Sequence, residues 1–208
     1  MLEVFIPAFT AFFVAIDPLG VAPIFAGLTA GTDKIYRRRI ALKAMVTVTI
    51  VLFLFAFLGK GFLGSLGISL DAFRVAGGLL LFLIAIDMVF EKRTQRRNNR
   101  ADQFQADNKG FEDISIFPLA IPMIAGPGAI TAVILMVSNY HGDPAAQAIV
   151  LGTLLFILVL TFFILVGAGF LVKVLGEAVT GAFTRILGVV LAALSVQYIF
   201  DGARALLA

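Results

Sequence analysis

Six long apolar segments alternate with short polar ones along the whole chain. They cover roughly residues 2–29, 40–63, 71–90, 113–138, 145–171 and 182–205. An α-helix that crosses the hydrocarbon core of a bilayer needs about 20 mostly apolar residues. The pattern therefore predicts an all-α polytopic membrane protein with six transmembrane helices and no separate soluble domain.

Proline and glycine interrupt two of these segments near their middle. The first contains Asp17-Pro18-Leu19-Gly20, and the fourth contains Gly126-Pro127-Gly128. Asp and Gly are accepted at the N-cap of a helix, and Pro is favoured at the first helical position. Each sequence therefore predicts that a helix stops and a second half-helix starts. Irregular backbone at this depth is tolerated only where protein buries it or where it lines a wet cavity.

The two interruptions belong to an internal repeat. A shift of 109 to 111 residues places Pro18 on Pro127, and it also places the third segment on the sixth, with Gly78 on Gly188. Because each half has three spans, an odd number, the second half must enter the membrane from the opposite side. The chain is therefore predicted to form two inverted three-helix repeats, which are typical of secondary transporters with a site at the midplane. The predicted division is 1–90 for the first repeat, 91–112 for a basic linker and 113–208 for the second repeat.

Composition agrees with a membrane protein. Apolar residues make up 61% of the 208 positions and charged residues 14%, and the mean hydropathy of +1.04 is far above that of soluble domains. The net charge of +3 does not indicate nucleic-acid binding, because most basic residues lie in connections on one side of the membrane. By the positive-inside rule that side faces the cytoplasm, so both termini are predicted outside it. The linker 91–112 is interpreted as a solvated cytoplasmic loop, with an anionic-lipid or partner site as the alternative.

Several kinds of chemistry are excluded or disfavoured by the residue types. The chain has no cysteine, which excludes disulfides, thiolate metal sites and iron–sulfur clusters. Its only histidine, His141, lies in a polar loop. We therefore expect no catalytic residues, no metal site and no resident cofactor, and we do not expect an enzyme.

Asp17 is the clearest candidate for a functional residue. An ionised carboxylate near mid-membrane costs several kcal/mol unless it is paired or hydrated. In an inverted repeat the N-termini of both half-helices point to the midplane and attract anions. We hypothesise that the second break binds a carboxylate, whereas Asp17 binds an ammonium group or a coupling H+ or Na+. The predicted substrate-binding residues are Asp17, Pro18, Leu19, Gly20, Gly126, Pro127, Gly128 and Ala129.

Other interpretations of these features stay open. The prolines could bend their helices only for packing, and Asp17 could only cap its own half-helix. Asp87 and its repeat partner Gln197 are candidates for coupling or gating, although Asp87 also suits a solvated helix end.

Taken together, the segment from Asp17 to Pro23 and the segment from Pro118 to Ile130 resemble the MarC family of bacterial inner-membrane proteins. The resemblance covers the whole chain, including its length, six spans and basic central loop. The family is grouped with LysE-type exporters, so the resemblance implies transport of amino acids, and we expect small neutral ones such as glycine and alanine. It implies a bacterial inner-membrane location, with membrane lipid and a small zwitterionic substrate as partners, and it leaves a homo-oligomer open.

Three further function classes compete with an amino acid carrier. An exporter of other small solutes would have the same architecture. An ion-conducting protein or a metal-ion transporter would need several acidic or His residues facing one another at depth, where only Asp17 is evident. A non-transporting membrane scaffold would have a dry, sealed interior between Pro18 and Pro127.

Overall fold

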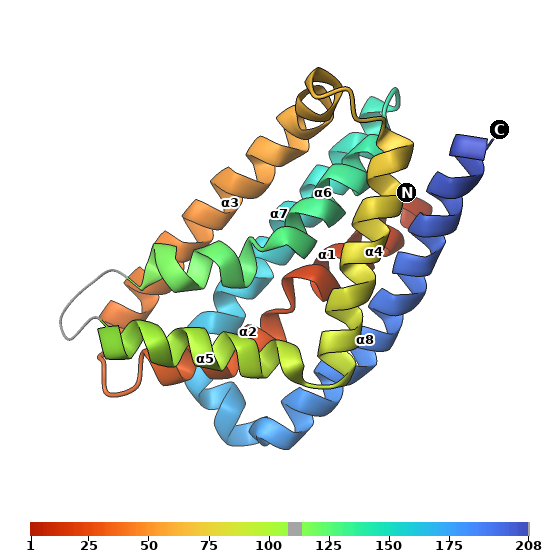
Figure 1. The fold of residues 1–208 in the computed structure, drawn as a ribbon. Helices are drawn as coiled ribbons and strands as arrows, with labels where there is room; N and C mark the ends of the chain where they lie inside the picture. The colour runs from red at the N-terminus through yellow and green to blue at the C-terminus, as the bar shows by residue number, and fades with distance from the viewer. Residues whose placement is uncertain (108–113, 208) are drawn as a thin grey trace.

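A computed structural model describes residues 1–107 and 114–207 and shows a bundle of helices (Figure 1). Within these ranges the helical elements are α1 (Leu2–Ile16), α2 (Pro18–Leu28), α3 (Lys34–Ser65), α4 (Leu70–Val89), α5 (Lys92–Asp107), η1 (Ser115–Ile124), α6 (Pro127–Asn139), α7 (Pro144–Val166) and α8 (Ala168–Leu207). The last helix bends at Gly176, which has a positive φ of 72°.

The elements account for the six predicted spans. Five of them are long and apolar enough to cross a membrane: α1 with α2, then α3, α4, α7 and the part of α8 after Gly176. The sixth is the pair η1 and α6, which meet at a bend of 57°. The polytopic all-α prediction is confirmed, and so is the break in the first span of each half. The fifth span ends at Val166, a few residues before the predicted end.

The helices α4 and α8, which correspond in the predicted repeat, form the most extensive helix contact in the described chain. A Cβ on Gly78 would lie 2.9 Å from the carbonyl oxygen of Ser195, and a Cβ on Gly188 would lie 3.1 Å from that of Ala85. A shift of 110 residues exchanges these two contacts, because it carries Gly78 to Gly188 and Ala85 to Ser195. Such mutual exchange is what a two-fold relation between the halves produces.

The central linker differs from the predicted solvated loop. Its described part forms α5, which lies crosswise at the end of the bundle where α3 begins (Figure 1). This helix contacts α2, α4 and η1. Arg97 and Ala101 on α5 are 5% and 6% exposed, so one face of the helix is buried. Residues 108–113 of the predicted linker lie outside the described ranges.

Candidate functional site

The first break is built around Asp17. Its backbone has φ 56° and ψ 62°, a left-handed conformation that Asp tolerates better than most residues. Its N–H donates to the carbonyl of Phe13 and ends α1, and its carboxylate accepts from the N–H of Gly20 at 3.1 Å and caps α2. A Cβ on Gly20 would lie 2.8 Å from the Asp17 carboxyl carbon. Glycine at position 20 therefore makes room for the capping carboxylate.

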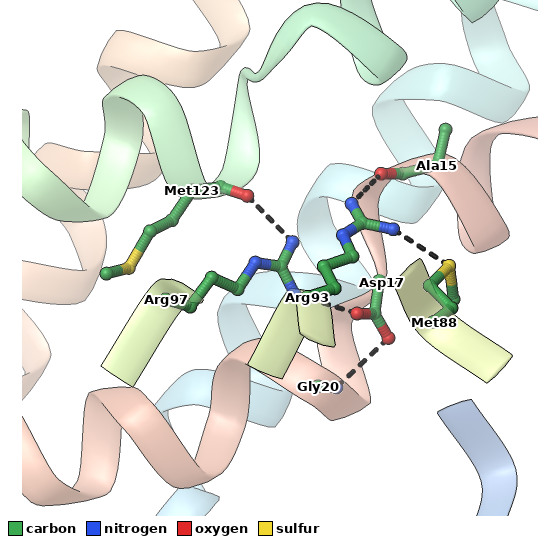
Figure 2. Close-up of polar contacts among 7 residues, drawn as sticks. All are labelled: Ala15, Asp17, Gly20, Met88, Arg93, Arg97 and Met123. Atoms are coloured by element: carbon green, nitrogen blue, oxygen red, sulfur yellow. Dashed lines mark hydrogen bonds and ion pairs between the residues drawn. The ribbon is translucent and has the colours of Figure 1, made fainter. Parts of the chain in front are cut away.

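The Asp17 carboxylate is fully buried and is paired with Arg97 of α5 (Figure 2). Nη1 of Arg97 lies 2.7 Å from Oδ2 of Asp17, and Nη2 donates to the carbonyl of Met123 at 2.9 Å. Met123 belongs to η1, just before the second break. One guanidinium thus bridges the two breaks and compensates the charge that Asp17 brings into the bundle.

Arg93 makes the equivalent contact with the first half. It donates to the carbonyl of Ala15 at 2.7 Å and to the sulfur of Met88 at 2.9 Å (Figure 2). Ala15 and Met123 each lie near the C-terminal end of their helix, where carbonyl groups lack helical partners and carry partial negative charge. Burial, and then the neighbouring charge of Arg97, lower the pKa of Arg93 to about 9. Arg93 therefore stays protonated at neutral pH.

The second break has a different chemistry from the first. Gly126 is the N-cap of α6, and within the described chain no side chain caps this helix. The first backbone hydrogen bond of α6 runs from the N–H of Ile130 to the carbonyl of Gly126. The preceding N–H groups of Gly128 and Ala129 therefore come before the helical ladder begins. A Cβ on Gly126 would lie 2.6 Å from the carbonyl oxygen of Pro122, so any side chain here would force the backbone to shift.

A cavity of about 270 Å³ lies at the start of α6. Its lining includes residues 126–129, Asp87 and the four arginines of α5, which are Arg93, Arg96, Arg97 and Arg100. Arg96 pairs with Asp87 at 2.5 Å. A second cavity of about 560 Å³ is lined by parts of α2, including Gly20, and by parts of α5 and α8. The positive end of α6 and the arginines make the smaller cavity suited to an anionic group.

The structure brings together most, but not all, of the predicted site residues. Pro18 is buried and Leu19 half-buried beside Asp17, and residues 126–129 and Asp87 line the smaller cavity. Gln197 lies on an exposed face of α8 and donates to Asp201 at 2.8 Å, so it is not part of this site.

Sequence reasoning missed Arg93 and Arg97. A signal for them was present, because the four arginines of α5 are spaced by three, one and three residues, which places them on one face of a helix.

Comparisons with known proteins agree with this architecture. The MarC family of integral membrane proteins matches residues 2–207. A UPF0056 membrane protein of Methanocaldococcus jannaschii is 39% identical over 202 residues, which is 97% of this chain and 87% of the relative. The UPF0056 membrane protein YhcE of Escherichia coli is 33% identical over 201 residues, 97% of this chain and 92% of the relative. No solved structure matches the chain. The family match spans both breaks, α5 and all six spans, so the chain belongs to the MarC family of integral membrane proteins.

Proposed function

We propose that this protein is a secondary carrier of small neutral amino acids, of the glycine or alanine type, that works by alternating access. The observation that supports this most is the Asp17–Arg97 ion pair, which joins two repeat-related helix breaks beside a cavity. Substrate sites of inverted-repeat transporters are formed by such discontinuous helices near the midplane. The cavity, at about 270 Å³, is near the lower limit of ligand pockets, which favours a small solute.

A zwitterion could enter this ion pair without leaving a buried charge unpaired. Its ammonium group would replace Arg97 at the Asp17 carboxylate, and its carboxylate would bind Arg97 and the N–H groups that start α6. Breaking a buried pair without replacement is strongly unfavourable. The exchange therefore favours a solute that has both charges over one that has a single charge.

Alternating access would require α5 to move. In the described conformation, Arg93 binds the end of α1, and Arg97 binds Asp17 at the first break and η1. We propose that α5 closes the basic side of the bundle in this state, and that it leaves α2 when the site opens to that side. A coupling H+ or Na+ at Asp17, once Arg97 has withdrawn, is the alternative to the ammonium group at that carboxylate.

A carrier of small organic anions is the second candidate. Four arginines line the smaller cavity, and Asp87 is the acidic residue among them. If Arg97 never leaves Asp17, the remaining site is positive and suits a carboxylate without an ammonium group. Among the described residues there is no cluster of three potential metal-binding side chains, so nothing there favours a metal-ion transporter.

Flux measurements on purified protein in liposomes separate these candidates. Labelled glycine, alanine and propionate would be offered under imposed proton and sodium gradients, since propionate is alanine without its amino group. A carrier of amino acids takes up glycine or alanine and excludes propionate. Equal uptake of propionate would select the anion carrier, and no flux of any probe under any gradient would contradict both.

Variants of the Asp17–Arg97 ion pair test whether the flux depends on this site. Asp17→Asn and Arg97→Gln should each abolish glycine uptake, because each removes one of the two groups that the zwitterion needs. Lys92→Gln is the control on the same helix, because Lys92 is exposed and lines neither cavity. Wild-type flux in Asp17→Asn, with unchanged proton and sodium dependence, would remove Asp17 from the mechanism.

A further inference from the structure

A basic groove on the bundle surface shares no lining residue with the two cavities near the breaks. It has a volume of about 470 Å³ and is lined by the first turn of α3 and by the junction of α7 and α8. Its lining includes Lys34 and Arg37 of α3 and Gly169, Phe170 and Lys173 of α8. We call this surface the basic groove.

The three cations of the basic groove are unpaired within the described chain. No side chain of Lys34, Arg37 or Lys173 has a hydrogen bond or an ion pair there, and no described acidic side chain lines the groove. Nε of Arg37 is buried and has no hydrogen-bond partner in the described structure. A buried donor without a partner is costly, and three like charges around one groove repel one another. Both features are relieved by a bound anion.

Unlike the cations of the basic groove, three arginines of α5 have partners within the protein. At the same end of the bundle, Arg93, Arg96 and Arg97 all have carboxylate, carbonyl or sulfur partners within the protein. The protein thus compensates the charges of these α5 arginines, whereas the described residues do not compensate the three cations of the basic groove.

The surroundings of the groove fit a lipid rather than a free ion. Phe170 is 74% exposed, and Ile35 and Val174 next to the cationic positions are also exposed. In a membrane bundle such side chains face acyl chains. The lack of a side chain at Gly169 keeps the groove open beside Arg37, since a Cβ at position 169 would lie 3.2 Å from Nη1 of Arg37. The groove therefore offers cations beside an apolar surface, as an amphiphile with an anionic head requires.

We propose that the basic groove binds the phosphate headgroup of one anionic phospholipid. Arg37 binds the phosphate through its guanidinium, which suits phosphate oxygens, and Lys34 and Lys173 add charge from the two sides. The acyl chains lie along the apolar surface that includes Phe170. The start of α3 and the junction of α7 and α8, which line the groove, lie at the end of the bundle where α5 lies (Figure 1). This is the basic side, which the positive-inside rule assigns to the cytoplasm. Basic pockets between transmembrane helices on that side are suited to anionic headgroups.

Lipid retention measured by native mass spectrometry tests this site independently of transport. The protein would be equilibrated in detergent with equal amounts of phosphatidylglycerol and phosphatidylcholine that have the same acyl chains. We expect the wild type to retain one phosphatidylglycerol in preference to phosphatidylcholine. A cation near an anionic membrane surface contributes about 1 kcal/mol, so Arg37→Gln should lower the preference about fivefold. Lys34→Gln/Lys173→Gln should lower it further.

The neighbouring residues Arg38 and Arg39 supply the matched control. They are exposed on the same turns of α3 but do not line the basic groove. Arg38→Gln/Arg39→Gln should keep the wild-type preference, and melting in phosphatidylcholine alone would show that every variant is folded. An equal loss in this control would mean diffuse surface attraction and would overturn the site, as would full retention in Arg37→Gln. Displacement of the lipid by inorganic phosphate at millimolar concentration would show that the groove holds a soluble anion, which also overturns the lipid assignment.

Discussion

The two helix breaks of this protein are related by the repeat but differ in what compensates them. At the first break, the Asp17 carboxylate caps α2 and is closed off by Arg97. At the second, Gly126 supplies no capping side chain, and the start of α6 opens on a cavity. The same kind of helix break therefore carries two different charges. At the first break a negative carboxylate is paired within the protein, and at the second the positive end of α6 opens on a cavity. In the proposed carrier, the predicted repeat would supply the two helix breaks, and single residues would set the charge at each of them.

The largest expected effect comes from breaking the compensation at the first break. Asp17→Asn or Arg97→Gln leaves one buried charge without its partner and should cost about 3–5 kcal/mol in the free energy of unfolding. Asp17→Asn/Arg97→Gln removes both charges and should recover most of that loss. Reversible unfolding in mixed micelles measures all three variants. Additive losses in the double variant would show that the two side chains do not act as a pair.

A smaller effect is expected from filling the space that both breaks need. Gly20→Ala would press on the Asp17 carboxylate, and Gly126→Ala would press on the carbonyl of Pro122. Overpacking of this kind costs about 1–3 kcal/mol. Gly152→Ala in α7 is the control, because nothing lies within 4 Å of a Cβ at that position. Thermal melting of the three variants should show a loss in the first two only, and an unchanged Gly126→Ala would argue against the tight turn.

The repeat itself predicts matched losses away from the breaks. Gly78→Ala and Gly188→Ala meet equivalent contacts at the α4–α8 interface, so each should lower stability by a similar amount, again about 1–3 kcal/mol. A large loss in one and none in the other would contradict the two-fold relation of the halves.

The smallest effect is expected at Arg96, on the exposed face of α5. Arg96 is 65% exposed and pairs with Asp87, and surface ion pairs contribute about 0–1 kcal/mol. Arg96→Gln should therefore change the melting temperature little, whereas Arg97→Gln, one residue further along, should change it strongly. Equal losses in the two variants would mean that burial does not distinguish these arginines.

The spans, the two breaks and the repeat could be predicted from the sequence, because they depend on local patterns of apolar residues, proline and glycine. The partner of Asp17 could not be found in that way, since it lies 80 positions further along the chain. The spacing of the arginines from Arg93 to Arg100 predicts a cationic helix face, but a pattern of charges does not say which surface that face covers.

Gln197 shows the opposite difficulty. Its position corresponds to that of Asp87 in the predicted repeat, yet the two residues do not share a site. In an inverted repeat, equivalent residues lie on opposite sides of the membrane midplane. Position in the repeat therefore predicts proximity only near the two-fold axis, where the breaks and the Gly78–Gly188 region lie.

An experiment that holds α5 against α2 tests most directly whether transport requires this helix to move. The chain has no cysteine of its own, so Ile24→Cys/Ala101→Cys provides one defined pair in a small buried cluster between α2 and α5. A reducible bifunctional thiol reagent would join the two positions in proteoliposomes, with the single-cysteine variants as controls. We predict that glycine flux stops in the cross-linked protein and returns when the cross-link is reduced. Undiminished flux with α5 cross-linked to α2 would contradict the claim that the Asp17–Arg97 pair must open for transport.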